Sequence, residues 1–196
     1  MNEFNQNDEN IEVTEETSVE TAPKKSIGRE IAEWVCSIAI ALIIALVLRN
    51  HVVILAKVDG NSMLPTLHNN ERLVVWRLGY EAEAGDIVIL DPPSGRGPYV
   101  KRIIATGGQT VKIDNATGDV YVDGEKLQEP YINNKTYAVQ GESEFKVPEG
   151  HAFVMGDNRG NSHDSRSADV SYIPEDKIYG EVVLRIWPLN TFGTVK

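Results

Sequence analysis

The feature that most constrains this chain is a nearly continuous apolar run from Ile31 to Leu48, broken chiefly by Glu33 near its start. At about 18 residues, the run is just long enough to cross the hydrocarbon core of a bilayer as a helix. A cleavable signal sequence would be followed by a site of small residues, but Arg49-Asn50-His51 follows this run and a long tail precedes it. We therefore expect one uncleaved transmembrane helix, which with its flanks covers residues 24–51.

The charge distribution separates an N-terminal tail from the rest of the chain. Residues 1–23 are crowded with Asp and Glu and hold few large apolar residues, so this tail is expected to be disordered. The formal net charge of the 196-residue chain is −10, which argues against a nucleic-acid partner, since such proteins favour a basic patch. Basic residues flank the apolar run on both sides, so charge alone orients the span only weakly.

Beyond the apolar run the pattern predicts β structure, because short stretches rich in β-branched and aromatic residues alternate with Gly, Pro and Asp-Gly turns. Asp123-Gly124 favours a tight hairpin. We expect a mainly β fold, with an antiparallel β domain over residues 52–196, a small β insertion at about 108–150, and one transmembrane helix before it. The expected strands are Val52–Ala56, Arg72–Trp76, Asp86–Leu90, Thr110–Ile113, Val120–Val122 and Ala152–Met155.

Two segments hold a candidate catalytic pair, Ser62 in Gly60-Asn61-Ser62-Met63-Leu64-Pro65 and Lys101 in Tyr99-Val100-Lys101-Arg102-Ile103. A serine hydroxyl needs a base to become a nucleophile, and a lysine amine can be that base only when it is neutral. With the ordinary lysine pKa of ~10.4, the amine is neutral in about one molecule in 2,500 at pH 7, whereas burial lowers the pKa by up to 3–5 units. In a strand, Lys101 shares a face with apolar neighbours, which favours burial.

A third segment strengthens this interpretation, because Ser62 alone resembles a turn residue and Lys101 alone resembles a solvated edge charge. Residues 156–166 read Gly-Asp-Asn-Arg-Gly-Asn-Ser-His-Asp-Ser-Arg and directly follow the apolar run Ala152–Met155. The segment is too dense in turn formers and charges to be the interior of a strand. It is typical of a functional loop.

The three segments resemble those of the type I signal peptidases, the membrane-bound Ser/Lys endopeptidases that remove signal peptides from exported proteins. The family's segments have the forms G-x-S-M-x-P-T-L, Y-V-K-R-I-I-A-T-G-G and G-D-N-R-x-N-S-x-D-S-R. All three occur here in that order. The resemblance covers roughly Val52 to Gly193, and the compact length is similar to the Gram-positive branch.

The resemblance implies a role for each matching residue. Ser62 would be the nucleophile, with its N–H donating to the oxyanion, and Lys101 the general base. Ser162 would orient the lysine amine. Some members have a serine as second oxyanion donor where this chain has Gly60, so a second donor would have to be backbone or water. Four charged residues are expected to support the site: Asp157, Arg159, Asp164 and Arg166. Asp164 and Arg166 are expected to form an ion pair within the loop.

The resemblance also implies a membrane-anchored serine endopeptidase with a cytoplasmic N-terminus and an extracytoplasmic catalytic domain. Its partners would be preproteins with signal peptides, the lipid bilayer and, by proximity, the secretion translocon. Substrate is expected to bind extended along a strand edge, with small residues one and three positions before the cut. No cofactor or metal ion is expected, because the four histidines lack the spacing of a metal site.

Three alternatives remain open. A Ser/His/Asp triad using His163 and Asp164 is disfavoured, because adjacent residues point apart in extended chain. A self-cleaving repressor-type Ser/Lys peptidase would need no membrane anchor and would have a helix-turn-helix segment. A signal-peptidase-like assembly factor without activity would be expected to lack the nucleophile or the base, and both are present here.

Overall fold

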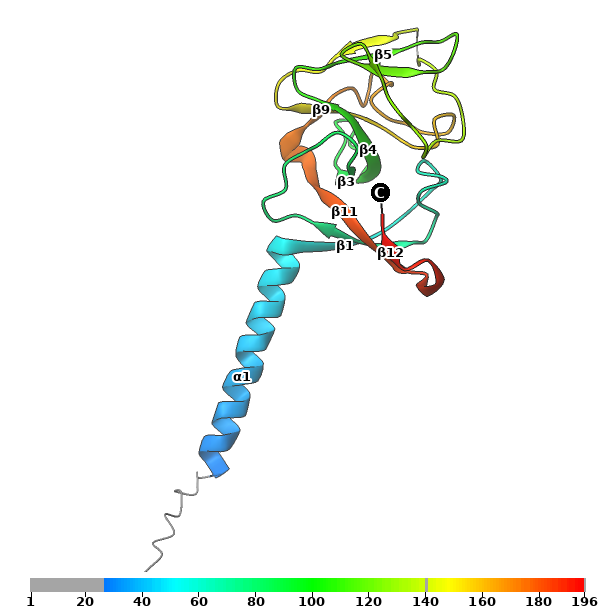
Figure 1. Cartoon of the computed structure of the whole chain (residues 1–196). Coiled ribbons are helices and arrows are strands. Elements are labelled where there is room, and N and C mark those ends of the chain that lie inside the picture. Colours follow the sequence, from blue (N-terminus) through cyan, green and yellow to red (C-terminus); the bar gives the residue numbers. More distant parts are fainter. Residues whose placement is uncertain (1–26, 140, 196) are drawn as a thin grey trace, which may run out of the picture. The chain divides into compact units, whose positions relative to one another are not determined.

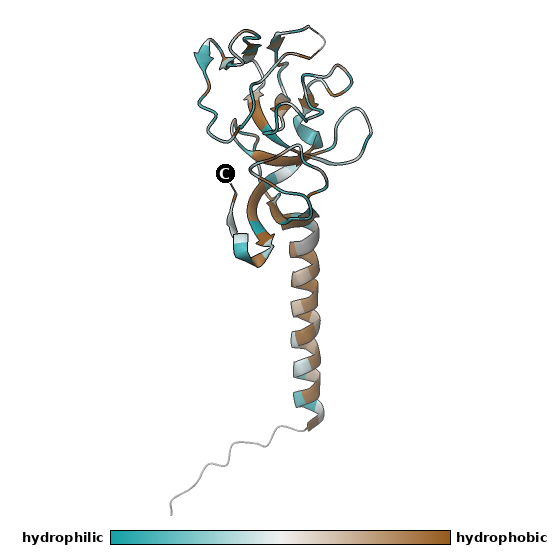
Figure 2. Ribbon diagram, turned by 90° about the vertical axis from the view of Figure 1, so that its right-hand side faces the viewer, coloured by the Kyte–Doolittle hydropathy of each residue, from teal (hydrophilic) through white to brown (hydrophobic). Residues whose placement is uncertain are grey.

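The computed structural model describes residues 27–139 and 141–195, and the chain divides into two compact units, the second of which begins at Ile43. A single unbroken helix, α1 (Ile27–Val47), covers most of the predicted apolar run and is long and apolar enough to cross a membrane (Figure 1). It presents hydrophobic residues along most of its length (Figure 2). The π-helical turn η1 (Leu48–Val52) connects it to the first strand. The predicted tail, residues 1–23, lies outside the described residues.

The second unit is built on an eight-stranded antiparallel sheet with the order β1-β2-β11-β3-β4-β9-β10, in which β12 also pairs with β11. Figure 1 shows that this sheet is curled and that β4 lies beside β9, with which it pairs. The sheet confirms the predicted mainly antiparallel β fold. Its strands are β1 (Val53–Lys57), β2 (Arg72–Trp76), β3 (Ile87–Leu90), β4 (Tyr99–Thr106), β9 (His151–Met155), β10 (Ile173–Pro174), β11 (Ile178–Trp187) and β12 (Gly193–Thr194).

The longest strand, β11, was not among the strands expected from the sequence. It lies between β2 and β3, and its register shifts against both of them, so its side chains do not alternate regularly. At Gly180 a Cβ atom would overlap the main-chain oxygen of Trp76, which explains why a glycine interrupts the strand. The 3-10 helix η2 (Glu175–Lys177) precedes β11 in the sequence, and the 3-10 helix η3 (Leu189–Thr191) follows it.

A second, four-stranded sheet with the order β7-β6-β5-β8 lies within the predicted insertion. Asp123 and Gly124 form its tight turn with φ angles of 52° and 85°, as the Asp-Gly pair predicts. Its inner side chains pack with Ile104 and Phe153 of the large sheet, so both sheets share one hydrophobic cluster. The strands are β5 (Thr110–Ile113), β6 (Val120–Val122), β7 (Glu125–Lys126) and β8 (Glu144–Lys146).

Strand β4 is covered on both of its faces, so both Lys101 and Arg102 are only 3% exposed. The turn that contains Ser62 is held down by Met63 and Leu67, which belong to a second hydrophobic cluster. Strand β9, the neighbour of β4, ends at Met155, immediately before the polar loop. The fold therefore brings the three predicted segments together.

Candidate active site

The site centres on a direct contact between the two residues that the sequence singled out. Lys101 Nζ lies 2.8 Å from Ser62 Oγ and also donates to the main-chain oxygen of Val100 at 3.0 Å. The Tyr99 ring covers the amine, with its centroid 4.9 Å from Nζ. A neutral amine in this position can accept the serine proton directly.

The surroundings of Lys101 favour that neutral form. Burial lowers the pKa of Lys101 from 10.5 to about 8 and is the largest effect. The carboxylates of Asp164 and Asp157 raise this pKa, and the Arg166 guanidinium lowers it. One pH unit below such a pKa, about one amine in ten is neutral, against a few in ten thousand for a free lysine. The buried site therefore supplies a usable base near neutral pH.

The Ser62 turn is fixed by residues that were not assigned a role from the sequence. The Asn158 N–H donates to the Ser62 carbonyl at 3.0 Å, and Asn158 Nδ2 donates to the Asn61 carbonyl at 2.9 Å. Gly156 packs so closely that a Cβ there would overlap both the Ser62 carbonyl oxygen and Ser162 Oγ. Both residues belong to the Gly-Asp-Asn tripeptide, whose turn-forming character was the available signal.

Asp157 connects the nucleophile segment to the strand of the base. Its carboxylate is fully buried and accepts two hydrogen bonds from Arg102, at 2.9 Å from Nε and 2.8 Å from Nη2. It also accepts the Thr66 hydroxyl at 2.5 Å. Because Arg102 follows Lys101 and Thr66 lies in the same turn as Ser62, this carboxylate joins the two predicted catalytic segments.

Asp164 and Arg166 form a buried bidentate ion pair, with both N–O distances at 2.8 Å. Asp164 also accepts the Gly156 N–H at 3.0 Å, which ties the two ends of the loop together. Burial alone would raise the pKa of Asp164, but the hydrogen bonds and charge of Arg166 outweigh it and hold that pKa below its ordinary value. The carboxylate is therefore ionised throughout the neutral range.

Ser162 and Gly60 lie beside the pair without the contacts that the family roles would need. Ser162 Oγ is buried and close enough to Asp164 to help lower the pKa of that carboxylate. Among residues 27–139 and 141–195, no group meets the full geometry of a hydrogen bond with this hydroxyl. Gly60 adopts φ +99°, and its N–H donates to Asn69 Oδ1 at 3.1 Å. That N–H is already engaged, so it is a poor candidate for the second oxyanion donor.

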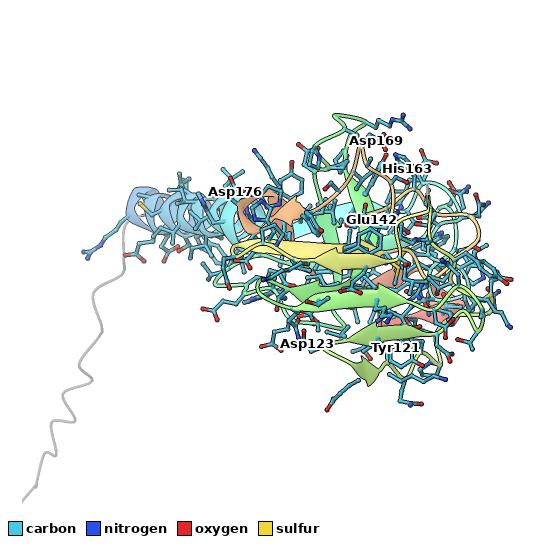
Figure 3. All side chains as sticks on the ribbon, turned by 90° about the horizontal axis from the view of Figure 1, so that it is seen from above. Tyr121, Asp123, Glu142, His163, Asp169 and Asp176 are labelled. Atoms are coloured by element: carbon cyan, nitrogen blue, oxygen red, sulfur yellow. The ribbon has the colours of Figure 1, made fainter. Side chains whose placement is uncertain are left out.

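His163 belongs to a different hydrogen-bond arrangement. Its Nε2 lies 3.0 Å from Asp169 Oδ2, and its ring meets the edge of Tyr99. Figure 3 shows His163 and Asp169 next to one another. Because Lys101 contacts Ser62 Oγ, while His163 pairs with a carboxylate other than Asp164, the geometry disfavours the Ser/His/Asp alternative.

An apolar cleft of about 520 Å³ is lined in part by β4, the strand that carries Lys101. One wall comes from β1 and the other from the start of β4, including Val100, the neighbour of Lys101. Strand β1 is the last strand on its side of the sheet, so one of its edges is available for pairing. The lining residues are Ile54, Leu55, Ala56, Lys57, Arg77, Ile89, Pro98, Val100 and Tyr179.

Comparisons with known proteins agree on one family. The family model described as signal peptidase, peptidase S26, matches residues 31–187. The chain is 40% identical over 197 residues to signal peptidase I T of Bacillus subtilis, covering 94% of this chain and 100% of that protein. Identity is 36% to signal peptidase IB of Staphylococcus aureus, over 84% of this chain and 93% of that protein. The chain therefore belongs to the signal peptidases, peptidase family S26.

Proposed function

We propose that this serine peptidase removes signal peptides from exported preproteins, with Ser62 as nucleophile and Lys101 as general base. The observation that supports these roles most strongly is the 2.8 Å contact between Lys101 Nζ and Ser62 Oγ inside a buried site. Burial lowers the pKa of Lys101 to about 8, and contact with the hydroxyl places the base where the proton leaves.

The reaction has two halves. In the first, Ser62 Oγ bonds to the carbonyl carbon of the scissile peptide while its proton moves to Lys101 Nζ; the amine then gives this proton to the leaving nitrogen. In the second, Lys101 takes a proton from water and the oxygen of that water bonds to the acyl carbon. The bond from this carbon to Ser62 Oγ then breaks as the amine returns the proton to Oγ, which frees the signal peptide with a new carboxyl terminus. The Ser62 N–H makes no hydrogen bond within the described part of the chain, so it is available for the oxyanion.

The cleft lined by β1 and Val100 supports binding of an extended peptide. A substrate paired with the open edge of β1 gains main-chain hydrogen bonds, and its alternate side chains enter the apolar cleft. A cleft bounded by Ile54, Ile89 and Tyr179 favours apolar side chains near the cut. An apolar lining of this kind fits the small substrate residues expected one and three positions before the cleavage site.

We further propose that the peptidase works at the membrane surface, anchored by α1, with its N-terminus in the cytoplasm and the β unit outside, near the secretion translocon. Leu55 is 73% exposed and Trp76 is 43% exposed on neighbouring strands. Trp187, Leu189 and Phe192 are also at least half exposed around η3. Exposed large apolar side chains of this kind favour contact with a bilayer.

The test of the activity is direct. The detergent-solubilised chain is incubated with a labelled preprotein, and the new N-terminus is sequenced beside a Ser62→Ala control. Cleavage after a small residue by the wild type alone is expected. A wild-type chain that binds the preprotein without cutting it would instead indicate the assembly-factor alternative.

A further inference from the structure

A stretch of the insertion without regular structure, residues 129–137, contacts all three buried arginines around the site. We call this stretch the clamp. Its contacts with Arg102, Arg159 and Arg166 cross from the insertion to β4 and to the polar loop. The family-like motifs of the sequence did not assign it any role.

Arg159 depends on the clamp for most of its hydrogen bonds. Its Nη2 pairs with Glu129 at 2.5 Å and its Nη1 donates to the Thr136 hydroxyl at 2.6 Å, while Nε donates to the Gly156 carbonyl at 3.1 Å. Arg159 and Glu129 are both almost completely buried in this pair. A guanidinium removed from water must have its N–H groups satisfied, so the clamp stabilises this conformation of the polar loop.

Tyr131 covers the arginine that neighbours the general base. Its ring lies 3.9 Å from Arg102 Cζ, and its hydroxyl donates to Glu129 at 3.3 Å. The same guanidinium holds Asp157 through two hydrogen bonds. The aromatic face therefore shields an ion pair that joins the Lys101 strand to the Ser62 turn.

The clamp also reaches the third arginine, because Arg166 Nη1 donates to the Tyr137 carbonyl at 3.2 Å.

We propose that the clamp is a positioning element for the Ser62–Lys101 pair, and that Tyr131 is the residue through which it acts. Tyr131 touches neither member of the pair; it fixes Arg102, which fixes Asp157 and, through Thr66, the Ser62 turn. The inference rests on the proposed Ser62–Lys101 mechanism.

The test compares Tyr131 variants of the full-length chain in preprotein cleavage. Tyr131→Leu removes the aromatic face and lets water reach the Arg102–Asp157 pair, so the two catalytic segments shift relative to each other. We expect kcat to fall by about 10- to 100-fold with KM changed less than about twofold, on the scale of small misplacements of catalytic groups. Tyr131→Phe keeps the ring face and should retain kcat within about twofold of wild type.

Two further variants test whether the loss of kcat is specific to the aromatic face of Tyr131. Tyr121 lies on β6 of the same insertion, at the opposite edge of Figure 3 from His163, and lines a polar groove, so Tyr121→Leu should keep kcat. Tyr131→Met fills a similar volume without an aromatic face and should show the same kcat loss as Tyr131→Leu. It serves as the readout if Tyr131→Leu does not fold.

A double-mutant cycle tests the connection itself. Tyr131→Leu and Thr66→Val act on the two sides of Asp157, so their effects on kcat should be less than multiplicative. Wild-type kcat in Tyr131→Leu or Tyr131→Met, an equal loss in Tyr131→Phe, a loss confined to KM, or multiplicative effects would each overturn the proposal. A Ser62→Ala arm distinguishes the failures: if Ser62→Ala remains active, the mechanism is wrong; if only the clamp variants remain active, the clamp alone is wrong.

Discussion

Arg102 and Asp157 form a buried bidentate ion pair that joins the strand of the proposed base to the polar loop, which is hydrogen-bonded to the turn of the proposed nucleophile. Fifty-five positions separate them in the chain. The Thr66 hydroxyl binds the same carboxylate, so one side chain connects both catalytic segments. The distance between Ser62 and Lys101 therefore depends on a group that touches neither of them.

Asp157→Ala should lower both stability and activity. The substitution leaves the Arg102 guanidinium buried without its partner, and breaking one side of such a pair costs about 3–5 kcal/mol. Denaturant unfolding measures the free energy of unfolding, and cleavage at saturating preprotein measures kcat. Unchanged unfolding would show that Arg102 finds another partner and that the pair does not support the fold.

Gly156→Ala should nearly abolish cleavage, because its Cβ would overlap the Ser62 carbonyl and Ser162 Oγ. The loop must move away from the nucleophile, and a displacement of about 1 Å costs on the order of 100-fold in rate. Gly160→Ala is the matched control, since a Cβ at that position of the same loop meets nothing within 4 Å. Equal kcat values for the two alanine variants would refute this close-packing account.

Much of the site could be predicted from the sequence, because Ser62, Lys101 and the polar loop are contiguous motifs with chemistry of their own. The partners of the charged residues could not. Asp157 pairs with Arg102 and Arg159 pairs with Glu129, across 55 and 30 positions, and single-chain patterns do not encode such distant pairs. Asn158 was missed because the two hydrogen bonds that it donates, from its N–H and from Nδ2, go to main-chain carbonyls of a turn that lies 96 and 97 positions away.

The fold was similarly predictable where side chains alternate. The expected bounds of Arg72–Trp76 and Thr110–Ile113 match β2 and β5. Strand β11 was missed because its register shifts and Gly180 interrupt the alternation that identifies a strand. Its place in the sheet depends on pairing with β2 and β3, which lie far away in the sequence.

Asp164 should make the protein sensitive to acid. Its folded-state pKa lies below the ordinary value of 3.8, so its contribution to stability is complete above pH 3.8 and is lost as pH falls through the folded-state pKa. Asp164→Asn should melt earlier at pH 7 and lose less Tm between pH 5 and pH 2. The exposed Asp176→Asn serves as control. An acid profile of Asp164→Asn that parallels wild type would contradict this assignment.

The pH dependence of cleavage should follow the ionisation of Lys101. The neutral amine is the active form, so kcat should rise with pH through an apparent pKa of about 8 and level off above it. Single-turnover cleavage from pH 6 to 10 measures this profile. A limb centred above pH 10 would mean that the site does not desolvate the lysine.

The central claim is that Ser62 and Lys101 act as one catalytic unit, and the most direct measurement is kcat for preprotein cleavage by Ser62→Ala, Lys101→Ala and the double variant, with His163→Ala in parallel. Because nucleophile and base act together, each single variant should lose essentially all activity, and the double variant should be little worse than either. His163→Ala should keep most of its activity, since its ring pairs with Asp169. Near-normal cleavage by Lys101→Ala, or loss of cleavage in His163→Ala, would contradict the account.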